Sequence, residues 1–112
     1  MRSTDTIYAL ATAPGRAGIA VFRISGPEAG AAFSAITACT ALPEARKTIR
    51  CRMVEPTTGA PLDDGLAVWF PGPGSFTGED VAELHVHGGR ATAEAVAEAL
   101  SSLRGLRLAE PG

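Results

Sequence analysis

The chain has 112 residues, of which 46% are apolar, and a formal net charge of −2 at pH 7. This length is typical of one domain with a single core, and this apolar content excludes a disordered tail. The nearly neutral charge gives no general electrostatic case for nucleic-acid binding. No apolar run is long enough to span a bilayer, and the first residues lack the apolar segment of a signal peptide. We therefore expect a cytoplasmic protein.

The first half of the chain predicts strands on either side of a turn, followed by a helix. Residues 5–13 alternate loosely, as in a strand, and a Pro-Gly turn separates them from residues 18–24. The second segment is apolar on both faces, which is typical of a central strand covered on each side. Ser25 and Glu28 then form a capping-box pattern that predicts a helix, whose apolar stripe extends to Ile36.

The second half predicts further strands and another helix. Residues 46–55 have the pattern of an exposed or edge strand, and residues 65–70 that of a short apolar strand. After a loop rich in proline and glycine, residues 80–87 predict a strand and residues 90–103 a helix with one apolar face. Residues 106–109 predict the start of a last strand. Together these elements predict an α+β domain, a mixed β-sheet with two or three packed helices.

Two charged side chains lie on predicted interior strands. Because side chains alternate along a strand, Arg23 shares a face with Val21. By the same count, Glu83 shares a face with His85 and His87. A charged group in an apolar strand is costly unless it meets an opposite charge or a ligand. Arg23 and Glu83 could therefore pair with each other, lie at solvated strand ends, or each contact a ligand.

The segment 75–89 combines a polar glycine-containing loop, a strand with titratable side chains and a Gly-Gly helix entrance. A small-molecule site needs a few fixed polar groups in an apolar wall, so we expect this segment to shape a pocket. The predicted pocket-shaping residues are Ser75, Phe76, Thr77, Gly78, Glu79, Asp80, His87, Gly88 and Gly89. Gly88 and Gly89 would let an anion approach a helix N-terminus, although a plain strand-to-helix turn explains them as well.

Other patterns carry weaker predictions. Glu83, His85 and His87 match a metal-ligand pattern on a strand, but the chain has no third histidine, and we predict no metal site. The two cysteines, Cys39 and Cys51, are isolated and are predicted to be free thiols. Three arginines share one face of the predicted edge strand, and we expect them to be solvated rather than to bind RNA. They are Arg46, Arg50 and Arg52.

Several segments together resemble the N-terminal domain of the bacterial tRNA uridine-modification GTPases, the MnmE/TrmE family. They are residues 5–7, 11–19, 23–27, 62–65, 70–73, 75–83, 87–89 and 107–112. The resemblance implies a fold similar to the folate-binding domain of aminomethyltransferases. It also implies that residues 1–112 form one domain, which binds 5-formyl- or methylene-tetrahydrofolate through Arg23 and Glu83 and forms a homodimer.

The resemblance implies a wider setting as well. In that family the folate supplies a one-carbon unit for C5 of the wobble uridine of tRNA, with an FAD-dependent partner protein of the MnmG/GidA type. GTP, Mg²⁺ and K⁺ belong to a separate GTPase domain. We therefore expect this chain to be a fragment that binds its ligand without catalysing a reaction. The alternatives are a scaffold that only dimerises and a free-standing enzyme similar to aminomethyltransferases.

Overall fold

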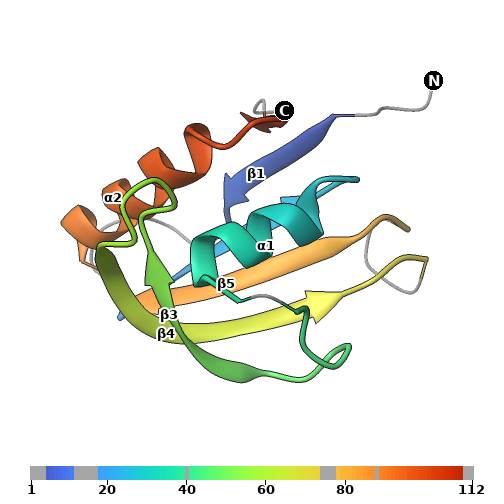
Figure 1. Ribbon diagram of the computed structural model, residues 1–112, viewed down its shortest axis with the longest axis horizontal. Helices are drawn as coiled ribbons and strands as arrows, with labels where there is room; N and C mark the ends of the chain where they lie inside the picture. Colours follow the sequence, from blue (N-terminus) through green and yellow to red (C-terminus); the bar gives the residue numbers. More distant parts are fainter. Residues whose placement is uncertain (1–4, 12–17, 40, 74–77, 88, 110–112) are drawn as a thin grey trace.

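The computed structural model describes residues 5–11, 18–39, 41–73, 78–87 and 89–109. Within them, six strands form one mixed sheet and two helices pack on it (Figure 1). The elements are β1 (Thr6–Leu10), β2 (Ile19–Ser25), α1 (Ala29–Thr37), β3 (Ile49–Val54), β4 (Pro61–Phe70), β5 (Val81–His87), α2 (Arg90–Ser101) and β6 (Leu106–Leu108). The predicted α+β class, with a mixed sheet and packed helices, is confirmed.

The strand order is β3-β4-β5-β2-β1-β6, so β5 and β2 lie side by side in the middle of the sheet. All neighbouring strands are antiparallel except β1 and β6, which are parallel. In the register between β2 and β5, Arg23 lies opposite Glu83 and Val21 lies opposite His85. The predicted edge strand is β3, whose outer side has no partner among the described strands.

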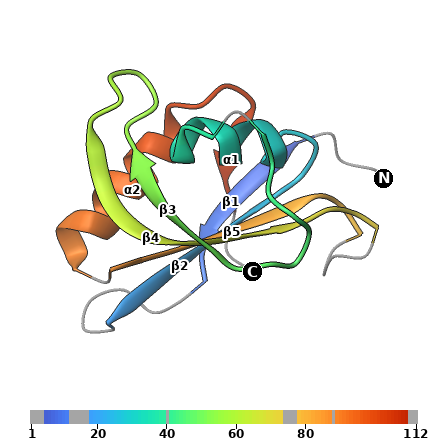
Figure 2. The ribbon, with the colours of Figure 1, turned by 60° about the horizontal axis from the view of Figure 1, so that its bottom comes forward.

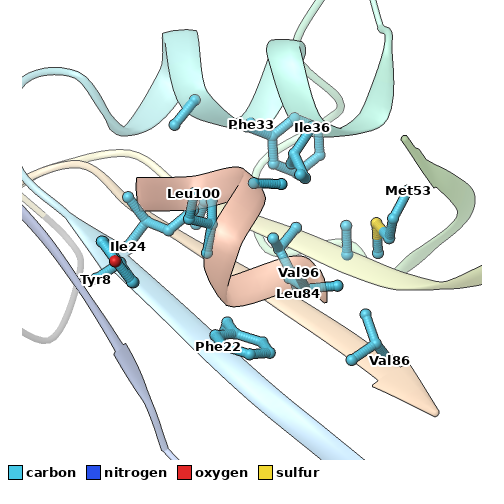
Figure 3. Close-up of a cluster of buried hydrophobic side chains, with 14 of the residues drawn as sticks. Tyr8, Phe22, Ile24, Phe33, Ile36, Met53, Leu84, Val86, Val96 and Leu100 are labelled. Atoms are coloured by element: carbon cyan, nitrogen blue, oxygen red, sulfur yellow. The ribbon is translucent and has the colours of Figure 1, made fainter. Parts of the chain in front are cut away.

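Both helices lie on the same side of the sheet, so the domain has two layers (Figure 2). Alternate residues of the central strands, such as Phe22 and Leu84, point toward the helices and are almost completely buried. Phe33 of α1 and Leu100 of α2 meet them from the helical layer (Figure 3). The burial of these apolar side chains is the main stabilising contribution in a domain of this size.

The other face of the sheet, which we call the open face, is covered by neither described helix. It carries the second set of alternating side chains, including Val21 and Arg23 of β2 and Glu83 of β5. Ile19, on the same face, is 51% exposed. The prediction that residues 18–24 are covered on each side is therefore wrong. Valine and isoleucine favour strands even where only one face is buried, so an apolar run alone does not prove two covered faces.

The predicted capping box is also wrong. Ser25 is the last residue of β2, and Glu28 is the N-cap of α1 but makes no capping bond with its own side chain. The hydroxyl oxygen of Thr6 in β1 instead accepts a hydrogen bond from the Glu28 backbone N–H at 2.7 Å. The backbone N–H at the N-cap of α1 therefore finds its hydrogen-bond acceptor in a residue from a distant part of the sequence.

β4 is longer than predicted, because it begins at Pro61 and not at Gly65. Its first residues pair only with β3, and its pairing with β5 starts at Leu66 opposite His85. Gly65 lies at this point of divergence, and a Cβ atom there would fall on the backbone carbonyl oxygen of His85. The close approach of two backbones requires glycine at this position.

Candidate functional site

The centre of the open face holds an ion pair between β2 and β5. Arg23 donates to Glu83 Oε2 from Nη2 at 2.8 Å and from Nε at 3.1 Å. The cross-strand register explains this contact, since the two residues lie directly opposite each other. Of the interpretations that the sequence leaves open, the structure shows the internal Arg–Glu pair.

The second oxygen of the Glu83 carboxylate faces His85. His85 Nε2 lies 3.1 Å from Glu83 Oε1, so both carboxylate oxygens have a polar partner. The Glu83 side chain is only 11% exposed, whereas the Arg23 side chain is 41% exposed. The carboxylate is therefore held in place, and the guanidinium is the part of the pair that a molecule on the open face reaches first.

The end of the polar loop is tied to the sheet by Asp80. Its carboxylate Oδ1 accepts a hydrogen bond from the Gly72 N–H at 2.9 Å, and its backbone carbonyl accepts one from the Gly26 N–H at 3.0 Å. Glu79 Oε1 accepts a hydrogen bond from the Ser25 hydroxyl at 3.4 Å. Gly78 has a φ of +81°, which suits glycine. Ser75, Phe76 and Thr77, predicted to shape the pocket, lie outside the described residues.

The other end of β5 is held by Asp63 of β4. The Asp63 carboxylate accepts a hydrogen bond from the His87 backbone N–H at 2.8 Å, and it lies 2.9 Å from the ring Nδ1 of His87. Gly89 is the N-cap of α2, and Gly88 lies outside the described residues. The His87 ring is 72% exposed, so it lies at the rim of the sheet.

The predicted pocket-shaping residues thus fall into two groups at opposite ends of β5. Gly78, Glu79 and Asp80 precede its first residue, and His87 is its last. A strand of seven residues is about 20 Å long at roughly 3.3 Å per residue, so the two groups do not touch each other. The Arg23–Glu83 pair lies between them.

A hollow of about 280 Å³ lies on the open face beside this pair. We call it the β4–β5 hollow, because it opens where β4 diverges from β5. It is lined chiefly by Ile19, Arg50, Asp64, Leu66, His85 and His87. A slightly larger hollow, about 320 Å³, lies on the helical side between α2 and β1 and is lined mainly by apolar groups. We place the candidate site on the open face, because the buried charged network adjoins the hollow there.

The structure gives no support to a metal ligand set. His85 faces Glu83 and His87 faces Asp63, so the two rings have different partners. Among the described residues, no three His, Cys, Asp or Glu side chains converge in a way that would hold a metal ion. Sequence reasoning missed the role of Asp63, because nothing near it in the chain indicates a partner at residue 87.

The comparisons with known proteins identify the family. Residues 6–112 match the family described as the N-terminus of the GTP-binding protein TrmE. This chain belongs to that family. The tRNA modification GTPase MnmE of Parvibaculum lavamentivorans is 58% identical over 108 residues, which cover 96% of this chain and 24% of that protein. The protein of the same name from Paramagnetospirillum magneticum is 60% identical over 97% of this chain and 24% of its own length.

The likeness extends to a mitochondrial protein. The human 5-taurinomethyluridine-[tRNA] synthase subunit GTPB3 is 52% identical over 110 residues, 98% of this chain and 22% of that protein. The chain therefore spans about a quarter of the length of these curated relatives. In the described part of the chain, neither helix has the length and hydropathy needed to cross a membrane.

Proposed function

We propose that this TrmE N-terminal domain binds a reduced folate, 5-formyl- or methylene-tetrahydrofolate, on its open face. The observation that carries the proposal is the Arg23–Glu83 pair, two charged groups set in an apolar sheet surface, with the Arg23 side chain 41% exposed. A charge held in such a wall is typical of a small-molecule site. The hollow beside it offers room for part of a ligand.

The residues suit the chemistry of a pterin ring. The ring presents adjacent N–H groups on one edge, and a carboxylate such as Glu83 can accept from such a pair. Oε1 of Glu83 has one partner, His85, and retains a lone pair for the ligand. Oε2 already accepts two bonds from Arg23, so one of these would be exchanged for a bond from the pterin edge. The planar guanidinium of Arg23 would meet a carbonyl oxygen of the ligand. The folate supplies one-carbon chemistry, while these residues bind and orient it.

Calorimetric titration of this chain with 5-formyltetrahydrofolate tests the proposal. We expect saturable heat with one site per chain, and a loss of at least about tenfold in affinity for Arg23→Met and for Glu83→Gln. Arg107→Met is the matched control, because Arg107 forms an exposed ion pair with Asp5 at the far edge of the sheet. Unchanged affinity in the Arg23 and Glu83 variants would refute the assignment.

The setting of this function is also a proposal. We propose that in the longer protein the bound folate serves the modification of C5 of a wobble uridine in tRNA, in the cytoplasm. An FAD-dependent partner of the MnmG/GidA type and a GTPase domain with its GTP, Mg²⁺ and K⁺ would complete the system. The names of the relatives support this setting, since the bacterial proteins are tRNA modification GTPases and the human protein is a subunit of a 5-taurinomethyluridine-[tRNA] synthase.

We further propose that the domain forms a homodimer. Away from the hollow, Leu108 is 62% exposed and Leu42 is 42% exposed, and exposed large apolar side chains are candidates for contact surfaces. Light scattering tests this proposal, with Leu108→Glu expected to shift a dimer to monomers. A chain that is monomeric at all concentrations would contradict it and would leave the folate proposal untouched.

A further inference from the structure

The β4–β5 hollow owes its existence to the path of β4. From Leu66 onward β4 pairs with β5, but before Gly65 it pairs with β3 alone. The two strands therefore separate on the side of His87, and the open face has a depression there instead of a continuous ladder. The hollow lies directly beside the Arg23–Glu83 pair, because its wall includes His85, whose ring contacts Glu83.

The lining of the hollow changes from apolar to cationic with distance from that pair. Leu66 lies opposite His85 on the next strand, and Arg50 lies opposite Leu66 on the strand after it. All three side chains point to the open face, because directly opposite residues of a sheet share a face. A ligand that extends from Glu83 across the hollow would first meet an imidazole and a leucine, and would then meet a guanidinium.

Arg50 is available for such a contact. It is exposed, and it forms no ion pair within the described part of the chain. The acidic side chain that also lines the hollow, Asp64, is engaged by Arg52 at 3.3 Å. The cationic end of the hollow therefore favours an anion, and the planar guanidinium fork suits a carboxylate in particular.

The spacing fits a ligand with a ring at one end and a carboxylate at the other. Glu83 and His85 are two residues apart along β5, and Arg50 is two strands away from His85. With about 3.3 Å per residue and about 4.8 Å per strand, the Cα atoms of Glu83 and Arg50 are about 12 Å apart. This span is of the same order as the separation of the two ends of an extended folate.

We infer that the β4–β5 hollow is a subsite for the benzoylglutamate end of the folate, with Arg50 as the residue that binds its carboxylate. The inference rests on the proposed function, because the ring end is placed at Arg23 and Glu83. The volume supports a subsite: about 280 Å³ is at the lower limit of roughly 300–1,000 Å³ for a complete small-molecule pocket. The flat benzoyl group would pack over Leu66 and the His85 ring.

Two ligands separate the subsite from the ring site. One is 5-formyltetrahydrofolate, and the other is 5-formyl-6-methyltetrahydropterin, which retains the ring and lacks the benzoylglutamate. We expect Arg50→Gln to weaken binding of the first by about tenfold and to leave binding of the second unchanged. Arg50→Lys should recover part of the loss. Arg107→Gln is the control, because it removes the same charge from the open face at the opposite edge of the sheet.

The outcomes are distinct. If Arg50→Gln binds the complete folate as well as the natural chain does, the subsite is wrong, while the ring site stands. If the natural chain binds both ligands equally, the subsite is also wrong. If Glu83→Gln leaves both affinities unchanged, or the natural chain binds neither ligand, the folate proposal fails and the subsite fails with it. Circular dichroism of each variant establishes that it is folded before titration.

Discussion

Asp63 binds both the backbone and the ring of His87, at 2.8 and 2.9 Å, at the point where β4 no longer pairs with β5. The carboxylate thus takes the place of a backbone carbonyl that the diverging strand does not supply. It fixes the end of β5 at His87, shortly before α2 begins at Arg90. The same contact connects the two strands at His87, which also lines the β4–β5 hollow.

Replacing Asp63 should destabilise the domain. We expect Asp63→Ala to lower the free energy of unfolding by about 1 kcal/mol, because the lost hydrogen bonds are partly exposed to water. Urea denaturation measures the change. The neighbouring Asp64→Ala is the control and should change stability by less than about 0.5 kcal/mol, since its ion pair with Arg52 is exposed. Equal effects of the two variants would mean that the contact with His87 contributes nothing of its own.

The Glu83 carboxylate should matter more, because it is buried and has two partners. We expect Glu83→Ala to cost about 2–3 kcal/mol, as Arg23 and His85 both lose their partner on the sheet. A double-mutant cycle with Arg23→Met should give a coupling free energy of at least about 1 kcal/mol. The exposed Arg107–Asp5 pair, measured in the same way, should give a value near zero. Similar coupling in the two pairs would contradict this account.

Gly65 should not tolerate a side chain. A Cβ atom there would fall on the carbonyl oxygen of His85, which is backbone and cannot rotate away. We expect Gly65→Ala to cost more than about 3 kcal/mol or to prevent folding. Thermal unfolding compares it with Gly18→Ala, where no atom of the described residues beyond the chain neighbours lies within 4 Å of the added Cβ. A Gly65→Ala protein as stable as the Gly18→Ala protein would show that β4 can change its path at this point.

The Cys51 thiol gives a prediction about pH. Burial, with smaller contributions from Cys39 and Asp64, raises the pKa of Cys51 to about 11. Below the usual thiol range, folded and unfolded chains are both protonated and pH has no effect through this group. As the pH rises from about 9 to 11, the unfolded chain loses the proton first, so folding becomes less favourable.

Urea unfolding at pH 8 and pH 10 tests this sign. The natural chain should lose more stability over this interval than Cys51→Ala does. Cys39→Ala is the matched control and should retain most of the loss. If Cys51→Ala loses as much stability as the natural chain, the folded environment does not favour the neutral thiol.

Short-range rules predicted the elements and the strand faces of Arg23 and Glu83, but they left open whether these two side chains pair. The alternation of side chains places Arg23 and Glu83 on defined faces of their strands, and the fold pairs these strands. The helix over residues 90–103 was predicted from its apolar periodicity, and α2 occupies Arg90–Ser101. Such rules work here because each depends on residues only a few positions apart.

The contacts that the sequence did not reveal join distant segments. The Thr6 hydroxyl accepts a hydrogen bond from the backbone N–H of Glu28 at the start of α1, although the local pattern favoured Ser25 as the capping residue. Asp63 meets His87 across a separation of 24 residues, and the hollow exists because β4 leaves β5 at Gly65. Each of these depends on strand order and on the point of divergence, which no window of neighbouring residues encodes.

The parallel pairing of β1 with β6 has a consequence for the growing chain. Thr6 lies opposite Leu106, and the Ala109 N–H donates to the Tyr8 carbonyl, so the first strand takes its outer neighbour from the last residues of the described chain. A ribosome that has made β1 through α2 has still not supplied that neighbour. We expect this edge of β1 to remain unpaired until then, so that synthesis of the last segment is the step that protects β1 from pairing with another chain.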